Sequence, residues 1–331
     1  MNKLSIRQIN IDYERKINNR AKLDTGKLCN YKCEFCYYKN HLTERDSLKT
    51  IYDRIDYLKA YGIEQIDLSG GESSIEPNWF KILEYCRDNF KRISCLSHGG
   101  KFSDVEFIER SYNLGLREIL FSLHGTTEGI HDTIVGKRGA FNNLMKAIYN
   151  AHQLGIEVRI NTTLYDLNYD NIDTNVIKNL QPTQVNFIAL NYWRDNADFN
   201  KTIDYPVVCN YAKKYIDELK DSVEVNARYF PYCHMEGYEQ YIKNHYHHIY
   251  DMKDWNKAVY NEQLNTTVDY THKEKVDQCF AEAERIRLQS CFKTQACTGC
   301  KYFFVCDGIE KQLKSHVEPK PVAGEKIKVI W

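Results

Sequence analysis

Three cysteines close together near the start of the chain carry its clearest chemical signal. Cys29, Cys33 and Cys36 have the spacing C-x3-C-x2-C, and Phe35 stands just before the third of them. Three thiolates from one short loop can hold three irons of a cubane cluster, which leaves the fourth iron open to a ligand that is not protein. The same cysteines together with His41 could instead bind zinc through three thiolates and an imidazole, with no open position.

A second group of cysteines lies near the end of the chain. Residues 297–308 contain the spacing C-x2-C-x5-C, formed by Cys297, Cys300 and Cys306. These three thiols can occupy one face of a second cubane, and a thiolate from another part of the chain must complete it. A zinc ribbon is the alternative, because C-x2-C pairs bind either metal.

The fourth ligand of this second site is predicted from position. Cys233 follows Pro231, which stiffens the turn, and it lies where the first part of the chain passes into the second. We therefore predict Cys233 as the ligand, with Cys291 as the second choice and Cys279 as the third. Three other cysteines are expected to be buried as small hydrophobic side chains: Cys86, Cys95 and Cys209.

Strand-like and helix-like segments alternate from residue 20 to residue 220. Apolar periodicity predicts helices over residues 47–61, 79–90, 103–115, 139–154, 169–180 and 207–220, the third opened by a capping box at residues 103–106. Strands are predicted over residues 22–27, 63–69, 92–97, 118–123, 156–164 and 184–191. Six β/α units predict a parallel sheet with right-handed crossovers, in either an open barrel or a doubly wound sheet.

Polar residues stand on or just after several of these strands. Gly70 and Gly71 follow the second strand, where paired glycines let the backbone approach a ligand closely, and Glu72 can accept from an ammonium group. The later strands add further candidates: Ser97 and His98, then Ser122, then Arg159 and Asn161. Arg159 and Asn161 share one strand face and could both point inward. His98 either lines a cavity or is satisfied by backbone groups.

The cysteine loop after the first strand, followed by these motifs in order, resembles the radical S-adenosylmethionine (radical SAM) superfamily over residues 20–220. The resemblance implies an α/β fold with a six-stranded partial (β/α)6 barrel, a 4Fe–4S cluster on the loop cysteines, and SAM bound at the open iron. It implies that Glu72 lies at the amino group of SAM and Ser122 at its ribose or carboxylate. The full set of implied cofactor contacts is Phe35, Tyr37, Gly70, Gly71, Glu72, Ser97, Ser122, Arg159 and Asn161.

The C-terminal cysteines resemble the auxiliary-cluster region of radical SAM proteins of the SPASM and twitch type. A full SPASM pattern continues with a cysteine three residues further on, but here Glu310 stands at that position and no cysteine follows Cys306. The resemblance therefore implies one auxiliary 4Fe–4S cluster. We expect an N-terminal extension at residues 1–19, the core at residues 20–222, and a small cysteine-rich subdomain at residues 223–331.

The composition indicates a soluble enzyme. Lys+Arg and Asp+Glu both number 45 in 331 residues, so the formal charge is zero, which argues against a nucleic-acid partner. The start of the chain has no apolar signal region and no stretch of about 18 apolar residues occurs, so we expect a cytoplasmic protein without membrane contact. Twelve cysteines in clusters suit a reducing compartment.

The resemblance implies a reaction in which one electron cleaves SAM and a 5′-deoxyadenosyl radical takes hydrogen from a substrate. It also implies an external one-electron donor of the flavodoxin or ferredoxin type. We expect a peptide side chain or a small polar metabolite as substrate. Fewer than 30 residues precede Cys29, so we expect the barrel and tail to bind any peptide. The alternatives are a nucleoside- or RNA-modifying radical SAM enzyme and a non-catalytic iron–sulfur or zinc protein.

Overall fold

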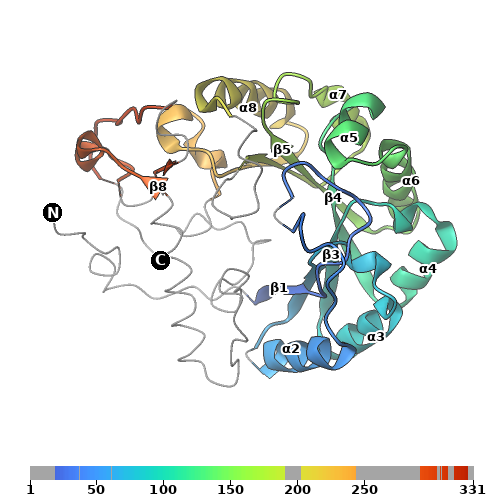
Figure 1. Cartoon of the computed structure of the whole chain (residues 1–331). Helices are drawn as coiled ribbons and strands as arrows, with labels where there is room; N and C mark the ends of the chain where they lie inside the picture. Colours follow the sequence, from blue (N-terminus) through green and yellow to red (C-terminus); the bar gives the residue numbers. More distant parts are fainter. Residues whose placement is uncertain are drawn as a thin grey trace.

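The computed structural model of the chain describes residues 19–36, 38–60, 62–190, 203–243, 291–303, 306, 308–311 and 317–326. Its main element is one sheet of seven strands, all parallel and in sequential order. The strands are β1 (Arg20–Asp24), β2 (Gln65–Ser69), β3 (Arg92–Ser97), β4 (Leu116–Ser122), β5 (Glu157–Leu164), β6 (Gln184–Ala189) and β7 (Glu224–Arg228). The sheet curls into a half-barrel (Figure 1).

Helices cover the outer face of this curled sheet (Figure 1). They are α2 (Leu48–Ala60), α3 (Trp79–Asn89), α4 (Val105–Asn113), α5 (Glu128–Val135), α6 (Ala140–Gln153), α7 (Thr174–Asn179) and α8 (Tyr205–Leu219). Each longer helix buries one apolar side, as α6 does with Leu144, Ile148 and Ala151. Short 3₁₀ turns lie at Ser73–Ile75, Lys101–Ser103, Tyr232–His234, Glu239–Tyr241 and Gln295–Gly299.

The expected α/β class and parallel order are confirmed, but the strand count of six is wrong. A seventh strand, β7, follows α8 and pairs with β6 along its whole length. Val225 and Ala227 of β7 are buried, and polar residues alternate with them. Five residues with two apolar positions are too short a signal to separate from a loop. The sheet thus continues past residue 222, and the domain boundaries stay predictions.

Two helices begin differently from the prediction. Asp104, not Ser103, caps α4, because its carboxylate accepts from the backbone N–H groups of Glu106 and Phe107. The capping box at residues 103–106 is therefore wrong by one position, and Ser103 instead donates to the carbonyl of Gly100 at 2.8 Å. Helix α5 was not predicted, and α7 is half as long as expected because residues 166–170 form a turn and residues 171–173 are irregular.

A buried network of charged side chains lies at the N-terminal end of the half-barrel. Arg20 donates to Asp67 through two hydrogen bonds of 2.6 Å and to Glu118 at 2.7 Å. Arg159 also donates to Glu118 at 2.7 Å, and to Gln184 at 2.8 Å. Burial raises the pKa of Glu118, but Arg20 and Arg159 outweigh it and hold that pKa at about 2. Each buried charge in this network has an opposite partner. Removing one member would leave an uncompensated charge in the core and would destabilise the fold.

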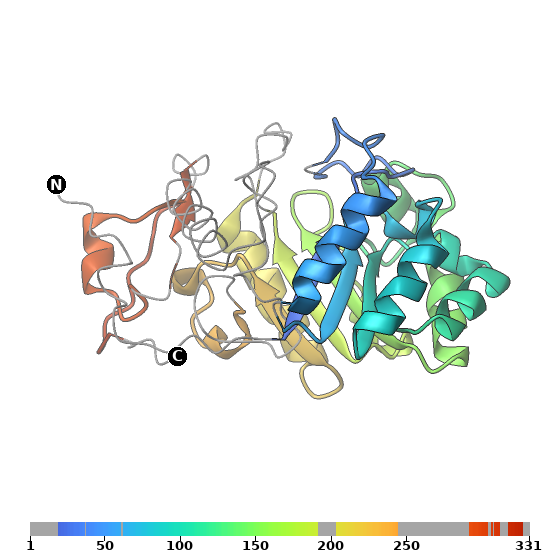
Figure 2. The ribbon, with the colours of Figure 1, turned by 90° about the horizontal axis from the view of Figure 1, so that it is seen from below.

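The C-terminal segment forms a small unit of its own. Strands β8 (Cys291–Phe292) and β9 (Ile309–Glu310) pair antiparallel. Figures 1 and 2 place this unit at one end of the molecule, next to the segment that follows β7. The contact is specific, since the Tyr302 ring stacks on Tyr232 at 4.8 Å and the Tyr302 hydroxyl donates to Glu239 at 2.6 Å. Within the described residues, no helix has the length and apolarity needed to cross a membrane.

Candidate active site

The cysteine loop leaves β1 at the C-terminal edge of the sheet, as predicted, and backbone hydrogen bonds hold it there. Three N–H groups of the loop donate to carbonyls at 3.0 Å: Cys29 to Leu42, Lys32 to Val135, and Glu34 to Ile134. The last two acceptors belong to the final turn of α5. The helix that sequence reasoning missed therefore fixes the stretch of loop that carries the cysteines.

Gly70 and Gly71 pack directly against this loop. A Cβ on Gly71 would lie 2.2 Å from the carbonyl oxygen of Leu28, and one on Gly70 would lie 2.0 Å from that of Gly26. The φ of Gly70 is +121°, a value that side chains other than glycine rarely adopt. The sequence predicted a close backbone approach at these glycines. Another backbone segment, the cysteine loop, makes that approach.

Glu72 is buried and fully engaged with protein groups. Its carboxylate is 2% exposed and accepts from the Ser74 hydroxyl at 2.5 Å, the Ser97 hydroxyl at 2.8 Å and the backbone N–H of His98 at 2.8 Å. Its own N–H donates to the carbonyl of Leu28 at 2.7 Å. Glu72 therefore joins the ends of β2 and β3 to the cysteine loop. Its contact with the amino group of SAM stays a prediction.

His98 supports the loop as a neutral side chain. Its ring stacks on Tyr31 at 3.6 Å between centroids. The N–H of Gly100 donates to Nδ1 at 3.0 Å, so the proton is on Nε2, which lies 2.9 Å from the Asn30 side-chain oxygen. Burial lowers the pKa of His98. Of the two readings offered by the sequence, the structure supports a satisfied, buried histidine beside the cysteine loop.

Phe35 is held by two aromatic rings that sequence reasoning did not select. It meets His124 edge-on at 4.7 Å and Tyr165 edge-on at 5.7 Å. The Tyr165 hydroxyl donates to Glu34 at 3.0 Å. Burial lowers the pKa of His124 to about 3, with a smaller contribution from His131, so the ring is neutral. The only sequence signal for His124 was its place two residues after Ser122.

The three loop thiols are partly accessible, and burial keeps two of them, Cys29 and Cys33, protonated in the protein alone. Burial raises the pKa of Cys29 to about 12 and also raises the pKa of Cys33. A positively charged metal centre would be needed to ionise them. The N–H of Tyr31 already donates to the Cys29 sulfur at 3.4 Å. Three reachable thiols with a backbone donor aimed at sulfur fit an iron–sulfur cluster.

The zinc alternative at this loop requires His41 as the fourth ligand beside the three thiolates. His41 forms a short hydrogen bond and ion pair with Glu44. A ring nitrogen of His41 is therefore engaged with a carboxylate outside the cysteine motif.

The other residues predicted to contact the cofactor do not all lie at the same end of the half-barrel. Ser97 donates to Glu72 and accepts from the N–H of Gly99, so its hydroxyl is a structural link. Ser122 and Asn161 are half-buried neighbours on β4 and β5. Arg159 lies in the charged network at the opposite end of its strand, an arrangement that gives it a structural role and does not favour contact with SAM. Tyr37 lies outside the described residues.

Four cysteines from two parts of the chain line a single cavity in the C-terminal unit: Cys233, Cys297, Cys300 and Cys306. The cavity has a volume of about 30 Å³, and apart from the cysteines its walls are mostly prolines and aromatic rings. Backbone N–H groups donate to two of the sulfurs, from Val322 to Cys300 at 3.4 Å and from Gly308 to Cys306 at 3.3 Å. Burial raises the pKa of Cys233, and the nearby Cys297 and Cys300 add to the effect.

The remaining cysteines do not join that cavity. Cys291 lies in β8 and does not line it, and Cys279 falls outside the described residues. The three cysteines expected to be hydrophobic core residues are each at most 1% exposed, which confirms that expectation: Cys86, Cys95 and Cys209.

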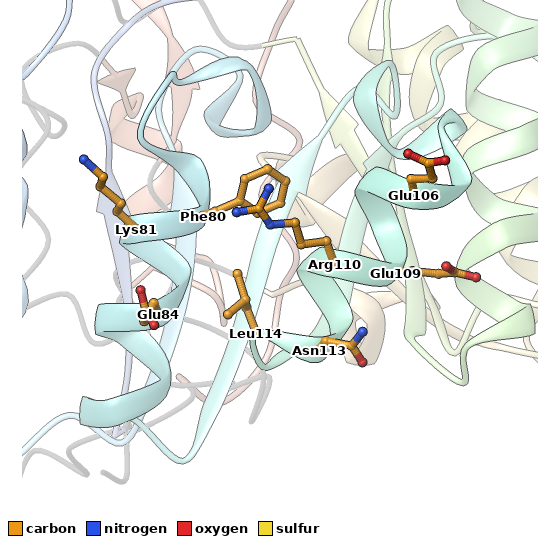
Figure 3. A pocket seen from close by; sticks show the side chains of 8 residues that line it. All are labelled: Phe80, Lys81, Glu84, Glu106, Glu109, Arg110, Asn113 and Leu114. Carbon is orange, nitrogen blue, oxygen red and sulfur yellow. The ribbon is translucent and has the colours of Figure 1, made fainter.

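A separate groove of about 450 Å³ lies on the helical exterior, between α3 and α4. Figure 3 shows Arg110 lying over the ring of Phe80, with Glu84 and Glu106 on either side. The guanidinium carbon of Arg110 is 3.9 Å from the centre of that ring. None of the predicted site residues lines this groove. It is therefore distinct from the edge of the sheet where the cysteine loop lies.

Comparison with known proteins agrees with this geometry. Residues 24–175 match the family model of the radical SAM superfamily. The antilisterial bacteriocin subtilosin biosynthesis protein AlbA of Bacillus subtilis is 24% identical over 208 residues, which cover 60% of this chain and 46% of AlbA. An S-adenosylmethionine-dependent nucleotide dehydratase of a Thermoplasmatales archaeon is 27% identical over 53% of this chain and 63% of its own length.

Among solved structures, Streptococcus suis SuiB bound to S-adenosylmethionine has a TM-score of 0.61 at 13% identity, covering 93% of this chain and 76% of SuiB. That likeness concerns the fold. The chain spans less than half the length of AlbA. The family model, which covers less than half of this chain, and the relatives show that the chain is similar to the radical SAM superfamily.

Proposed function

We propose that this chain is a radical SAM enzyme that uses two iron–sulfur clusters to take a hydrogen atom from a peptide side chain. The observation that carries the proposal is the cysteine loop, which follows β1 and is fixed on three sides by α5, the glycine pair and Glu72. When bound there, a 4Fe–4S cluster and SAM supply a 5′-deoxyadenosyl radical after one-electron reduction. Cys29, Cys33 and Cys36 would hold this cluster.

The residues around the loop would place SAM and keep the site rigid. Ser122 and Asn161 have side chains in reach of the half-barrel interior, and both can donate to oxygens of the ligand. Gly70 and Gly71 allow the loop and the end of β2 to lie against each other. Phe35, fixed by His124 and Tyr165, would cover one side of the cluster.

The auxiliary cluster would be held by Cys233, Cys297, Cys300 and Cys306. Their convergence on one cavity supports this ligand set over one with Cys291. The cavity walls are largely apolar, which protects a cluster from solvent, and N–H groups donate to two sulfurs. An auxiliary cluster in this place would accept an electron or ligate the substrate.

A peptide is the substrate class that we favour. AlbA is by its name a bacteriocin biosynthesis protein, and SuiB has also been solved bound to its precursor peptide SuiA, with a TM-score of 0.61 over 93% of this chain. A nucleotide is the second candidate, because the archaeal nucleotide dehydratase matches over a similar share of this chain.

The test is anaerobic incubation of the reconstituted protein with SAM, dithionite and deuterated candidate substrates. The candidates are peptides encoded beside the gene, and nucleoside triphosphates. Deuterium transferred from peptide into 5′-deoxyadenosine, read by mass spectrometry, would support the proposal. Transfer from a nucleotide alone would replace the peptide by the second candidate. No 5′-deoxyadenosine under any condition would refute the radical SAM function.

A further inference from the structure

Three asparagines form a row across the last strands of the sheet. Asn161 of β5 is in register with Asn186 of β6, which is in register with Asn226 of β7. The Asn226 amide nitrogen donates to Asn186 Oδ1 at 3.2 Å, and the Asn186 amide nitrogen donates to Asn161 Oδ1 at 2.8 Å. The three amides, which we call the asparagine ladder, are therefore bonded head to tail from β7 to β5.

The ladder lies on the concave face of the half-barrel. The residues next to Asn186 on β6, Val185 and Phe187, belong to the core beneath the helices, where Phe187 packs on Tyr215 of α8. Because successive side chains of a strand point to opposite faces, Asn186 and its ladder partners face the interior. That interior is where the loop motifs place the cofactor.

Burial differs along the ladder in a way that points to a ligand. Asn186 and Asn226 are 1% and 0% exposed, whereas Asn161 is half-buried. Its oxygen is occupied by Asn186, and its two N–H groups have no protein partner within the described part of the chain. The hydroxyl of Ser122, its neighbour in register on β4, likewise has none there. Two adjacent polar groups that face the interior, one of them a fixed donor, suit an acceptor oxygen of a ligand.

We propose that the asparagine ladder sets the polarity of Asn161, so that its amide always presents N–H donors to an acceptor oxygen of bound SAM. This inference rests on the proposed SAM-dependent function. An isolated asparagine can turn its amide by half a turn and offer either oxygen or nitrogen. Here, turning Asn161 would set its NH₂ against the NH₂ of Asn186 and leave a buried donor unpaired. Asn186 and Asn226 are thus positioning residues that act through Asn161.

The test reverses the direction of the hydrogen bond between residue 186 and Asn161. In Asn186→Asp the new carboxylate accepts from Asn226 and can only accept from Asn161, so Asn161 must turn its oxygen toward the ligand. The dissociation constant of SAM should rise about tenfold or more, measured by anaerobic calorimetric titration of the cluster-loaded protein. Gln184→Glu is the matched control. It adds the same charge on the same face of β6, where the side chain at position 184 contacts Arg159 and Glu224 and not the ladder, and it should leave SAM affinity unchanged.

A double-mutant cycle separates positioning from general damage. Asn161→Ala should weaken SAM binding by itself, and Asn186→Asp should add no further loss in that background. An undiminished effect of Asn186→Asp in the Asn161→Ala protein would refute the ladder, as would unchanged affinity in Asn186→Asp alone. If the aspartate variant does not fold, Asn186→Ser, whose hydroxyl is too short to reach Asn161, enters the same cycle with the same expectation. Wild-type protein that fails to bind SAM would refute the proposed function instead.

Discussion

Replacing Glu72 tests whether one buried carboxylate holds the edge of the site together. In Glu72→Ala, three donors lose their acceptor: the hydroxyls of Ser74 and Ser97 and the backbone N–H of His98. The hydroxyls can turn toward other partners, but the N–H is fixed by the backbone. An unsatisfied buried donor costs about 1–3 kcal/mol, so the three together should lower the free energy of unfolding by about 3–5 kcal/mol.

Glu72→Gln should be much milder. Its remaining oxygen can accept from the N–H of His98, and its NH₂ can donate to the two hydroxyl oxygens, so only the charge-assisted part of the bonds is lost, about 1–2 kcal/mol. Ser74→Ala removes one donor and keeps the carboxylate, with an expected loss of about 1 kcal/mol. The order of stability should therefore be wild type, Ser74→Ala, Glu72→Gln and Glu72→Ala.

The assay is chemical denaturation of the reduced, iron-free protein, with the free energy of unfolding taken from the transition. Equal losses in Glu72→Gln and Glu72→Ala would contradict the reasoning, because glutamine keeps hydrogen-bond partners for all three groups and alanine keeps none. An unchanged free energy of unfolding in Glu72→Ala would show that the carboxylate does not stabilise the fold. Its role would then be confined to the ligand.

Three further changes have clear expected outcomes. Gly71→Ala should abolish cluster assembly at the loop, measured as loss of about four irons per chain, whereas Gly129→Ala, which meets nothing within 4 Å, should assemble normally; normal assembly in both would contradict the close packing. The pKa of Glu118 is depressed to about 2, so its stabilisation is present above its unfolded pKa near 4.5 and is lost as pH falls toward 2. Glu118→Gln should be less stable than wild type at pH 7, and a denaturation series should show the gap closing over that range; a constant gap would count against the charged network. Cys233→Ala should lose about four irons while still cleaving SAM, and Cys291→Ala should keep them; the reverse result would reassign the fourth ligand.

Apolar periodicity was enough to predict most of the fold. Six of the seven strands follow from segments such as residues 156–164, where Ile156, Val158 and Ile160 alternate with polar residues at the period of a strand. β7 was missed because only Val225 and Ala227 of its five residues are apolar, and pairing with β6 supplies the rest of its stability. The N-cap of α4 was misplaced because Ser103 and Asp104 are both good capping residues, and only geometry distinguishes them.

Some residues of the candidate site could likewise be predicted from the sequence, and others could not. Cysteine spacing is local and chemically specific, so it groups Cys297, Cys300 and Cys306. Cys233 was added from its position after Pro231 where the barrel passes into the tail, and its place in the cluster remains a prediction that the common cavity supports. Arg159 was chosen because it shares a face with Asn161, but sequence does not reveal how far along the barrel axis a side chain lies. His124 and the asparagine ladder depend on register between strands far apart in the chain, which single-sequence patterns do not contain.

The most direct test of the central claim compares two cysteine variants side by side. We propose that Cys33 belongs to the cluster that cleaves SAM and that Cys300 belongs to a separate, auxiliary cluster. After anaerobic reconstitution with SAM and dithionite, wild type and Cys300→Ala should both form 5′-deoxyadenosine, and Cys33→Ala should form none, while Cys86→Ala, which alters a buried cysteine outside both sites, should match wild type. Formation of 5′-deoxyadenosine by Cys33→Ala at the wild-type rate would contradict the account.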